Sequence, residues 1–276
     1  MKPALFAVLA LAVACPARAD DGAAAGRAVL AKYQEAVVTV RLVVSYSMTM
    51  GGRSHQNETK TEASGIVLDP SGLTVISLAT IDPSAMMKAR QRSGGEEMKV
   101  DAAVKDAKIV FADGSEAAAA VVLRDKDLDV AFLRPLEKLP KAAVAVDLKG
   151  GAKPQVLDEV VCLTRLGKIA DRTVAVSLER IDALVSKPQK YYVIAAGGSS
   201  GIGSPVFALS GAPLGVILIR NGQTEGDANA ASMFSGTAAM GMMPIVAPAA
   251  DILEDEKQAL TAKLPAKTEP EKAEPE

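Results

Sequence analysis

Histidine is the scarcest side chain in this sequence that can act as a general base. The chain of 276 residues contains one histidine, His55, and two cysteines, Cys15 and Cys162. Catalysis of the Ser-His-Asp type would have to use His55, because a serine without a neighbouring base stays protonated and is a weak nucleophile. His55 lies in a polar stretch, for which we expect a solvated loop. A zinc site cannot be completed from so few Cys and His ligands, and we expect no metal and no cofactor.

Serines and glycines are concentrated in residues 197–204. The G-x-S-x-G spacing of a nucleophile elbow occurs at 197–201, but that motif requires a histidine later in the chain, and none follows. The N–H groups of Ser200 and Ile202 could instead form a backbone turn that receives an anion. The alternative is a flexible glycine loop.

Composition excludes several classes of protein. The hydrophobic content of 49% is typical of a globular chain rather than a disordered one. Aromatic residues make up 3%, tryptophan is absent and the formal net charge is -2. The chain has no excess of basic residues to neutralise phosphates and few aromatic side chains on which unpaired bases could stack. We therefore expect no nucleic-acid partner.

The first 19 residues have the pattern of an export signal. Lys2 precedes an apolar run at 4–14, and Ala17-Arg18-Ala19 is a small-x-small cleavage site. We therefore expect an exported protein, periplasmic or secreted, and no later apolar run is long enough for a transmembrane span. In the alternative, Cys15 carries a lipid anchor and the protein is a membrane-anchored lipoprotein. Either outcome leaves Cys162 without an intrachain disulfide partner.

Short β-branched segments between turn residues dominate the rest of the chain. A helix at 22–35 and another at 249–259 flank this part, with a polar hairpin loop at 53–62, a partly helical excursion at 83–107 and a solvated Lys/Glu/Pro tail at 260–276. Many short strands with little helix between them indicate an all-β sandwich or double barrel. The expected strands are 37–47, 65–68, 73–78, 108–111, 117–123, 129–133, 156–163, 173–181, 191–195, 206–207, 214–219 and 242–246.

Four segments with recognisable turn and strand patterns occur one after another in the chain. Residues 64–81 run from a glycine through apolar residues and an Asp-x-x-Gly turn into a strand, and residues 113–134 join an Asp-Gly turn to Leu128-Asp129-Val130-Ala131. The stretch 200–206 reads Ser-Gly-Ile-Gly-Ser-Pro-Val, and 211–216 follows with Gly-Ala-Pro-Leu-Gly-Val. These segments resemble the histidine, aspartate and serine segments of HtrA/Deg-type trypsin-like serine proteases over about residues 36–253.

The resemblance implies an all-β fold of two six-stranded antiparallel β-barrels with short terminal helices. The expected organisation is a signal peptide at 1–19, an N-terminal helix at 20–35 and a trypsin-like domain at 36–259. Within that domain the barrels would span about 36–148 and 150–248, followed by the helix at 249–259. The peptide-binding PDZ domain usual in the family has no counterpart in this sequence.

The chemistry departs from the family at two of three catalytic positions. Carried over by position, the histidine falls on Ala79 and the serine on Ile202, and the aspartate alone keeps its residue, as Asp129. An alanine methyl cannot accept a proton, and isoleucine has no atom that attacks a carbonyl. Asp129 itself is either a relic of the cleft or a strand-end carboxylate capped by backbone N–H groups.

We therefore expect an exported pseudoprotease that binds a protein or an extended peptide and hydrolyses nothing. Family members hold substrate by adding its backbone to a sheet edge, which needs no catalytic residues. The alternatives are an active serine endopeptidase with an atypical catalytic set, for which a shifted alignment would offer Ser200 or Ser204, and a structural part of a cell-envelope assembly. The expected binding residues are Ser199, Ser200, Gly201, Ile202, Gly203, Ser204 and Val216.

Overall fold

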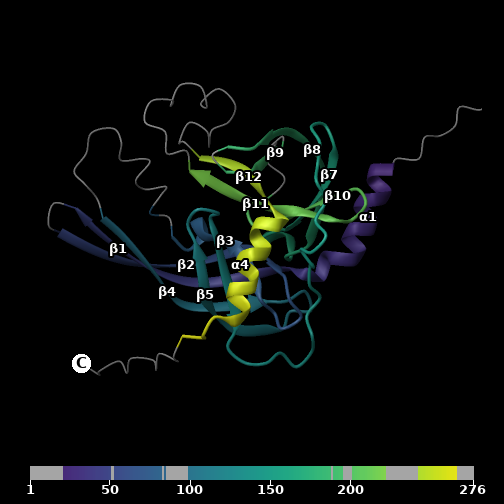
Figure 1. The fold of residues 1–276 in the computed structure, drawn as a ribbon. Coiled ribbons are helices and arrows are strands. Elements are labelled where there is room, and N and C mark those ends of the chain that lie inside the picture. Colours follow the sequence, from purple (N-terminus) through teal and green to yellow (C-terminus); the bar gives the residue numbers. More distant parts are fainter. Residues whose placement is uncertain are drawn as a thin grey trace, which may run out of the picture.

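The protein folds into two closed β-barrels of six antiparallel strands each (Figure 1). This computed structural model describes residues 21–50, 53–82, 84, 99–187, 189–194, 201–221 and 242–265. The expected all-β fold of two six-stranded barrels is confirmed, and it is consistent with a trypsin-like double-barrel fold. The leader with Cys15, residues 83 and 85–98 of the expected excursion at 83–107, and residues 266–276 lie outside the described residues.

The first barrel closes in the strand order β1-β2-β3-β6-β5-β4. The strands next to the second barrel are buried on both faces, with every residue of β3 and all but one of β6 buried, whereas most residues of β5 are partly or fully exposed. The turn at 69–72 connects β2 to β3, and the Ser71 N–H donates to Asp69 Oδ1 (2.8 Å) there, while Gly72 adopts a φ of +92°. The strands are β1 (Val37–Met50), β2 (Arg53–Val67), β3 (Thr74–Ser77), β4 (Lys99–Val110), β5 (Glu116–Asp125) and β6 (Val130–Pro135).

The second barrel closes in the order β10-β11-β12-β9-β8-β7. Cys162 is buried inside it, as expected for a small hydrophobic side chain. Its strands are β7 (Glu159–Arg165), β8 (Val174–Val185), β9 (Tyr191–Ile194), β10 (Pro205–Ala208), β11 (Pro213–Asn221) and β12 (Met242–Pro248). Short 3₁₀ turns occur at η1 (Gln34–Ala36), η2 (Leu78–Thr80) and η3 (Lys168–Ala170).

Three buried clusters make up the core. One fills the first barrel around Leu42 and Leu133, and a second fills the other barrel around Ile181 and Ile217. The third and largest lies between the barrels and beneath the helices, and it includes Phe132. Because this third cluster draws on both barrels, the junction between them is held by apolar packing as well as by hydrogen bonds.

Two helices pack on the outside of the barrels. Helix α1 (Asp21–Tyr33) contacts β7 and β8, and its Tyr33 ring stacks on Phe207 of β10 at a centroid distance of 4.7 Å. Helix α4 (Ala249–Thr261) lies against β5, β11 and β12 (Figure 1). The Arg134 guanidinium of β6 donates to the Leu260 carbonyl (2.8 Å) and so caps the end of α4. Each helix therefore joins elements that are distant in the sequence.

Two expected elements differ from the structure. Residues 53–62 are not a hairpin loop but the outer part of β2, and residues 99–107 are not an excursion but part of β4. Both segments pair with β1, which runs to Met50 instead of ending near 47. Polar residues can occupy these strands because this part of the sheet extends beyond the barrel and is largely exposed.

Candidate functional site

The Asp129 carboxylate lies just before β6 and is surrounded by hydrogen-bond donors. The Ser77 hydroxyl donates to Asp129 Oδ2 (2.6 Å), and the Ala79 N–H donates to Asp129 Oδ1 (3.0 Å). The Leu78 N–H also donates to the Asp129 carbonyl oxygen (2.8 Å). Asp129 has a φ of +60°, a conformation unusual outside glycine, which these bonds stabilise. The structure thus brings Ala79 and Asp129 into direct contact.

The second barrel supplies a further donor to the same carboxylate. The Ile219 N–H on β11 lies 3.3 Å from Asp129 Oδ2. One side chain of the first barrel therefore accepts hydrogen bonds from both barrels. Asp129 is thus capped by backbone N–H groups, as one of the two expectations for it proposed, and it lies at the junction of the barrels.

Burial raises the pKa of Asp129 to about 6. The hydrogen bonds from Ser77, Ile219 and Ala79 favour the ionised form and oppose this shift, while the nearby Asp82 carboxylate adds to it. At neutral pH the group is mostly a carboxylate and can accept all three bonds. In trypsin-like chemistry an aspartate orients an imidazole; the donors to Asp129 in the described residues are a hydroxyl and two backbone amides.

The loop at 201–204, just before β10, is hydrogen-bonded to β11 near Asp129. The Gly203 N–H donates to the Ile217 carbonyl (2.7 Å), and the Ile217 N–H donates to the Ser204 carbonyl (2.9 Å). Ile219 is two residues further along the same strand edge, about 7 Å away. The loop with Ile202 and the Ala79–Asp129 contact therefore lie at the same junction between the barrels.

Gly203 holds this loop against the first barrel. It has a φ of +85°, and a Cβ atom placed on it would lie 2.4 Å from the Ser64 carbonyl oxygen of β2. No larger residue fits here without movement of backbone. Within this tight loop the Ile202 side chain is 40% exposed. Ile202 is thus an exposed apolar residue at the place where the resemblance puts a nucleophile.

The remaining expected binding residues are mostly enclosed. Ser204 is buried, and its Oγ lies 2.8 Å from Thr164 Oγ1. Val216 is also buried, in the cluster between the barrels. Gly201 is half-buried and donates from its N–H to Thr164 Oγ1 (3.2 Å). Ser199 and Ser200 lie outside the described residues.

The sole histidine is far from this junction. His55 is exposed and paired with Met48 near the outer end of β2. It lies about 35 Å along the strand from Ile66, where β2 reaches β3. The expectation of a solvated residue is right and the expectation of a loop is wrong. An imidazole at this position cannot take a proton from a hydroxyl beside Asp129.

Two residues of the site were not expected from the sequence. Ser77 supplies the shortest hydrogen bond to Asp129, and Ile219 supplies the donor from the second barrel. Ser77 had one visible signal, a hydroxyl two residues before Ala79 on the same strand segment. Ile219 had none, because its contribution is a backbone N–H brought near by the packing of the barrels.

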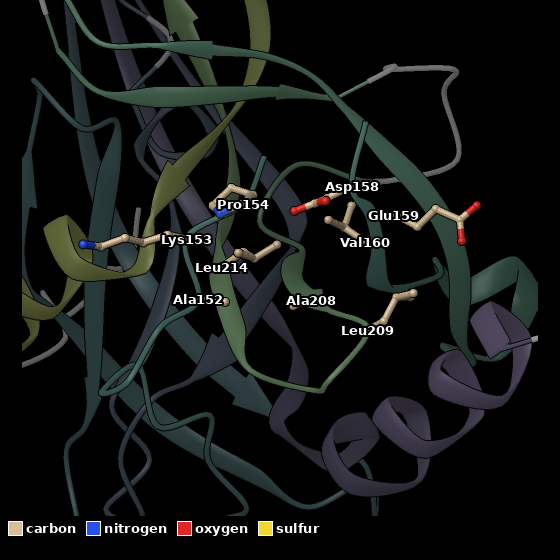
Figure 2. Close-up of a pocket in the computed structure, with 9 residues that line it drawn as sticks. All are labelled: Ala152, Lys153, Pro154, Asp158, Glu159, Val160, Ala208, Leu209 and Leu214. Carbon is tan, nitrogen blue, oxygen red and sulfur yellow. The ribbon is translucent and has the colours of Figure 1, made fainter. Parts of the chain in front are cut away.

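A separate surface pocket of about 230 Å³ lies on the second barrel (Figure 2). The Asp158 carboxylate points into the hollow, and its Oδ2 accepts the Gln155 N–H (2.7 Å). None of its lining residues belongs to the Asp129 site. The described residues contain no group of three or more His, Cys, Asp or Glu side chains placed to hold a metal ion. The pocket is lined by Ala152, Lys153, Pro154, Asp158, Glu159, Val160, Ala208, Leu209 and Leu214.

Comparisons with known proteins do not assign the chain. No protein-family model matches the sequence, and no curated protein matches it. Among the residues that the structure describes, no helix is both long and apolar enough to cross a membrane.

Proposed function

We propose that this protein is an exported, non-hydrolytic relative of HtrA/Deg-type trypsin-like proteases that binds a protein or an extended peptide. One observation carries the proposal: the Asp129 carboxylate is engaged by Ser77, Ala79 and Ile219, and none of these three groups is a base. A carboxylate arranged in this way supports the junction of the barrels and has no imidazole to orient. The junction would then serve for contact rather than turnover.

The contact surface that we propose centres on Ile202. Its side chain is exposed, whereas those of Ser204 and Val216 are buried and remain outside the proposed surface. The neighbouring edge of β11 pairs with β10 only as far as Val216, and the Ile219 N–H is taken by Asp129. An extended segment could pair with this edge beyond Ile219 while its apolar side chain contacts Ile202.

Peptide binding tests the contact. A peptide library screened against the whole chain should yield extended apolar ligands, and calorimetry with one synthetic ligand should show at least a tenfold loss of affinity for Ile202→Asp. Ile169→Asp is the matched control, because Ile169 is a fully exposed isoleucine (103%) on the turn η3, outside both the 201–204 loop and β11. Equal losses in both variants, or no loss in either, would count against a surface at Ile202.

Labelling with a fluorophosphonate tests the absence of turnover. The probe reacts with activated serines, so the purified wild-type chain should show no labelling above that of the heat-denatured protein. Saturable labelling of the folded chain, lost on mutation of a single serine, would establish the alternative of an active endopeptidase. Binding of one envelope protein without any peptide ligand would favour the alternative of an assembly part.

A further inference from the structure

The strands β1, β2 and β4 continue beyond the first barrel as a three-stranded arm (left in Figure 1). The arm comprises residues 43–50, 53–62 and 99–106, with β1 in the middle. β3 joins β2 only at Ile66 and Val67, and β5 joins β4 only from Lys108 onward. In the described part of the chain, both outer strands of the arm therefore have an edge with no strand beside it.

These two edges are not equivalent. β4 contains a bulge, since the register shifts between Val43 and Val44 and leaves Lys105 without an opposite residue. Bulges protect an edge because they interrupt the regular row of hydrogen-bonding groups. β2 pairs with β1 from Arg53 to Ile66 without any shift in register. The β2 edge is thus long and regular, and its residues 53–60 are all exposed.

The hydrogen-bonding phase of β2 shows which groups point outward. Met50 pairs with Arg53, and two residues separate them. The pair that flanks a two-residue loop is a hydrogen-bonded pair, and such pairs alternate along the strands. The backbone N–H and C=O groups of the odd-numbered residues of β2 therefore point toward β1. At the other end, the Leu68 N–H donates to the Leu73 carbonyl (2.8 Å), on the side away from β1. Even-numbered residues therefore present N–H and C=O groups to the open edge: Ser54, Gln56, Glu58, Lys60 and Glu62.

The charges along this edge favour one register for the pairing of two copies of the chain. In a two-fold antiparallel pairing with Thr59 opposite Thr59, each Glu58 lies opposite Lys60 of the other copy. Moving the centre by one residue places Glu58 opposite Glu58, or Lys60 opposite Lys60, and like charges directly opposite are unfavourable. A centre at Thr61 would require Glu62, which already pairs with Arg172 (2.6 Å). Glu58 and Lys60 have no ion-pair partner among the described residues.

We propose that the chain forms a two-fold symmetric dimer in which the β2 edges of two copies pair antiparallel about Thr59. The occupant of the edge is a second copy, because the sequence 56–62 is complementary to itself in that register. Such an isologous contact closes after two copies and leaves no growing end on β2. The inference does not depend on the proposed peptide-binding function.

Charge reversal tests the pairing. Sedimentation velocity of the wild-type chain over about 1–500 µM should show a weight-average mass that rises towards twice the monomer mass, since small interfaces dissociate readily. Glu58→Lys alone and Lys60→Glu alone should each weaken the dimer at least tenfold. An equimolar mixture of the two variants should restore it, because opposite charges again face each other in both pairs. Asp101→Lys on β4 is the matched charge control and should leave the dimer unchanged.

A symmetric disulfide tests the register. Thr59→Cys places a thiol opposite itself across the two-fold axis and should give rapid oxidation to a covalent dimer. Asn57→Cys is an equally exposed control whose two copies would lie about 13 Å apart, too far for a disulfide. Native Cys15 and Cys162 are common to both variants. A wild-type chain that stays monomeric at every concentration, or equal cross-linking of the two variants, overturns the proposal.

Discussion

The Ala79 N–H donates to the carboxylate of Asp129 across a distance of 3.0 Å, although the two residues are 50 positions apart. The contact places the backbone of Ala79 next to a buried acid at the junction of the barrels. In a trypsin-like protease this acid orients a histidine. Here its bonds to Ser77, Ala79 and Ile219 join β3, η2 and β11 to the residue just before β6, so the Asp129 carboxylate links the two barrels.

Asp129→Ala should destabilise the protein by about 2–3 kcal/mol, because it leaves the N–H groups of Ala79 and Ile219 buried without an acceptor. Asp129→Asn retains one carbonyl oxygen and should cost about half as much. Urea denaturation at pH 7 measures both changes. Asp113→Ala is the control, since that exposed carboxylate caps a surface turn through Ser115. Equal effects at the two positions would contradict a supporting role for Asp129.

Ala79→His should create an imidazole whose pKa is raised above the ordinary value of about 6.5. The nearby carboxylate favours the imidazolium, and the imidazolium in turn should lower the pKa of Asp129 from about 6. An NMR pH titration in a His55→Gln background follows this imidazole alone. An unshifted value would show that the side chain of residue 79 points away from Asp129, and the position-by-position assignment of the histidine site would then be wrong.

Much of the fold could be predicted from the sequence, because barrel strands combine β-branched residues with strong turn signals. The turn at 69–72 and the helix at 249–259 are examples. The outer part of β2 could not be predicted, since residues 53–60 have no buried face and so no alternation of apolar and polar side chains. Its strand conformation is imposed by pairing with β1 rather than by its own residue types.

The site was predictable in part. The contact between Ala79 and Asp129 followed from the resemblance to trypsin-like proteases, which fixes the order of the segments. The burial of Ser204 and Val216 could not be predicted from the sequence. Ser204 lies in a glycine-rich segment and Val216 in an apolar one, and either kind of segment can form the wall of a groove as well as part of a core. Backbone donors such as Ile219 carry no residue-type signal at all.

Gly203→Ala should destabilise the junction by about 3 kcal/mol or more. The positive φ of Gly203 strains any L-residue, and its Cβ would meet the Ser64 carbonyl oxygen. Gly114→Ala separates the two causes, because Gly114 has a similar φ of +81° with no atom within 4 Å of the added Cβ. That control should cost about 1 kcal/mol. Thermal unfolding compares them, and equal losses would mean that the close approach of the barrels at Gly203 contributes nothing.

Two buried carboxylates on α4 should make the stability of the protein depend on pH. Burial raises the pKa of Glu256 from 4.5 to about 7, and the Asp147 and Asp69 carboxylates add to the shift while Lys149 and Lys257 oppose it. Burial likewise raises the pKa of Asp255 to about 6, with Asp125 and Glu254 adding to it. Glu256 Oε2 and Asp255 Oδ2 are buried and have no hydrogen-bond partner within the part of the chain that the structure describes. Both groups therefore favour the protonated form when α4 is docked.

Glu256→Gln should stabilise the folded protein by about 1–2 kcal/mol at pH 8 and have little effect at pH 4. Below pH 4.5 the Glu256 carboxyl is protonated in both the folded and the unfolded chain. As the pH rises from 4.5 to about 7, the unfolded chain loses this proton first, because its pKa is the lower of the two. The free energy of unfolding of the wild-type protein therefore falls over that range of pH. The neutral amide removes this dependence. Urea midpoints at pH 4, 6 and 8 measure it, with Glu254→Gln as the control, because Glu254 is exposed and paired with Lys257 (3.2 Å). The urea midpoint of Glu256→Gln should fall less steeply with pH than that of Glu254→Gln. If both fall equally steeply, the groups that make stability depend on pH do not include Glu256.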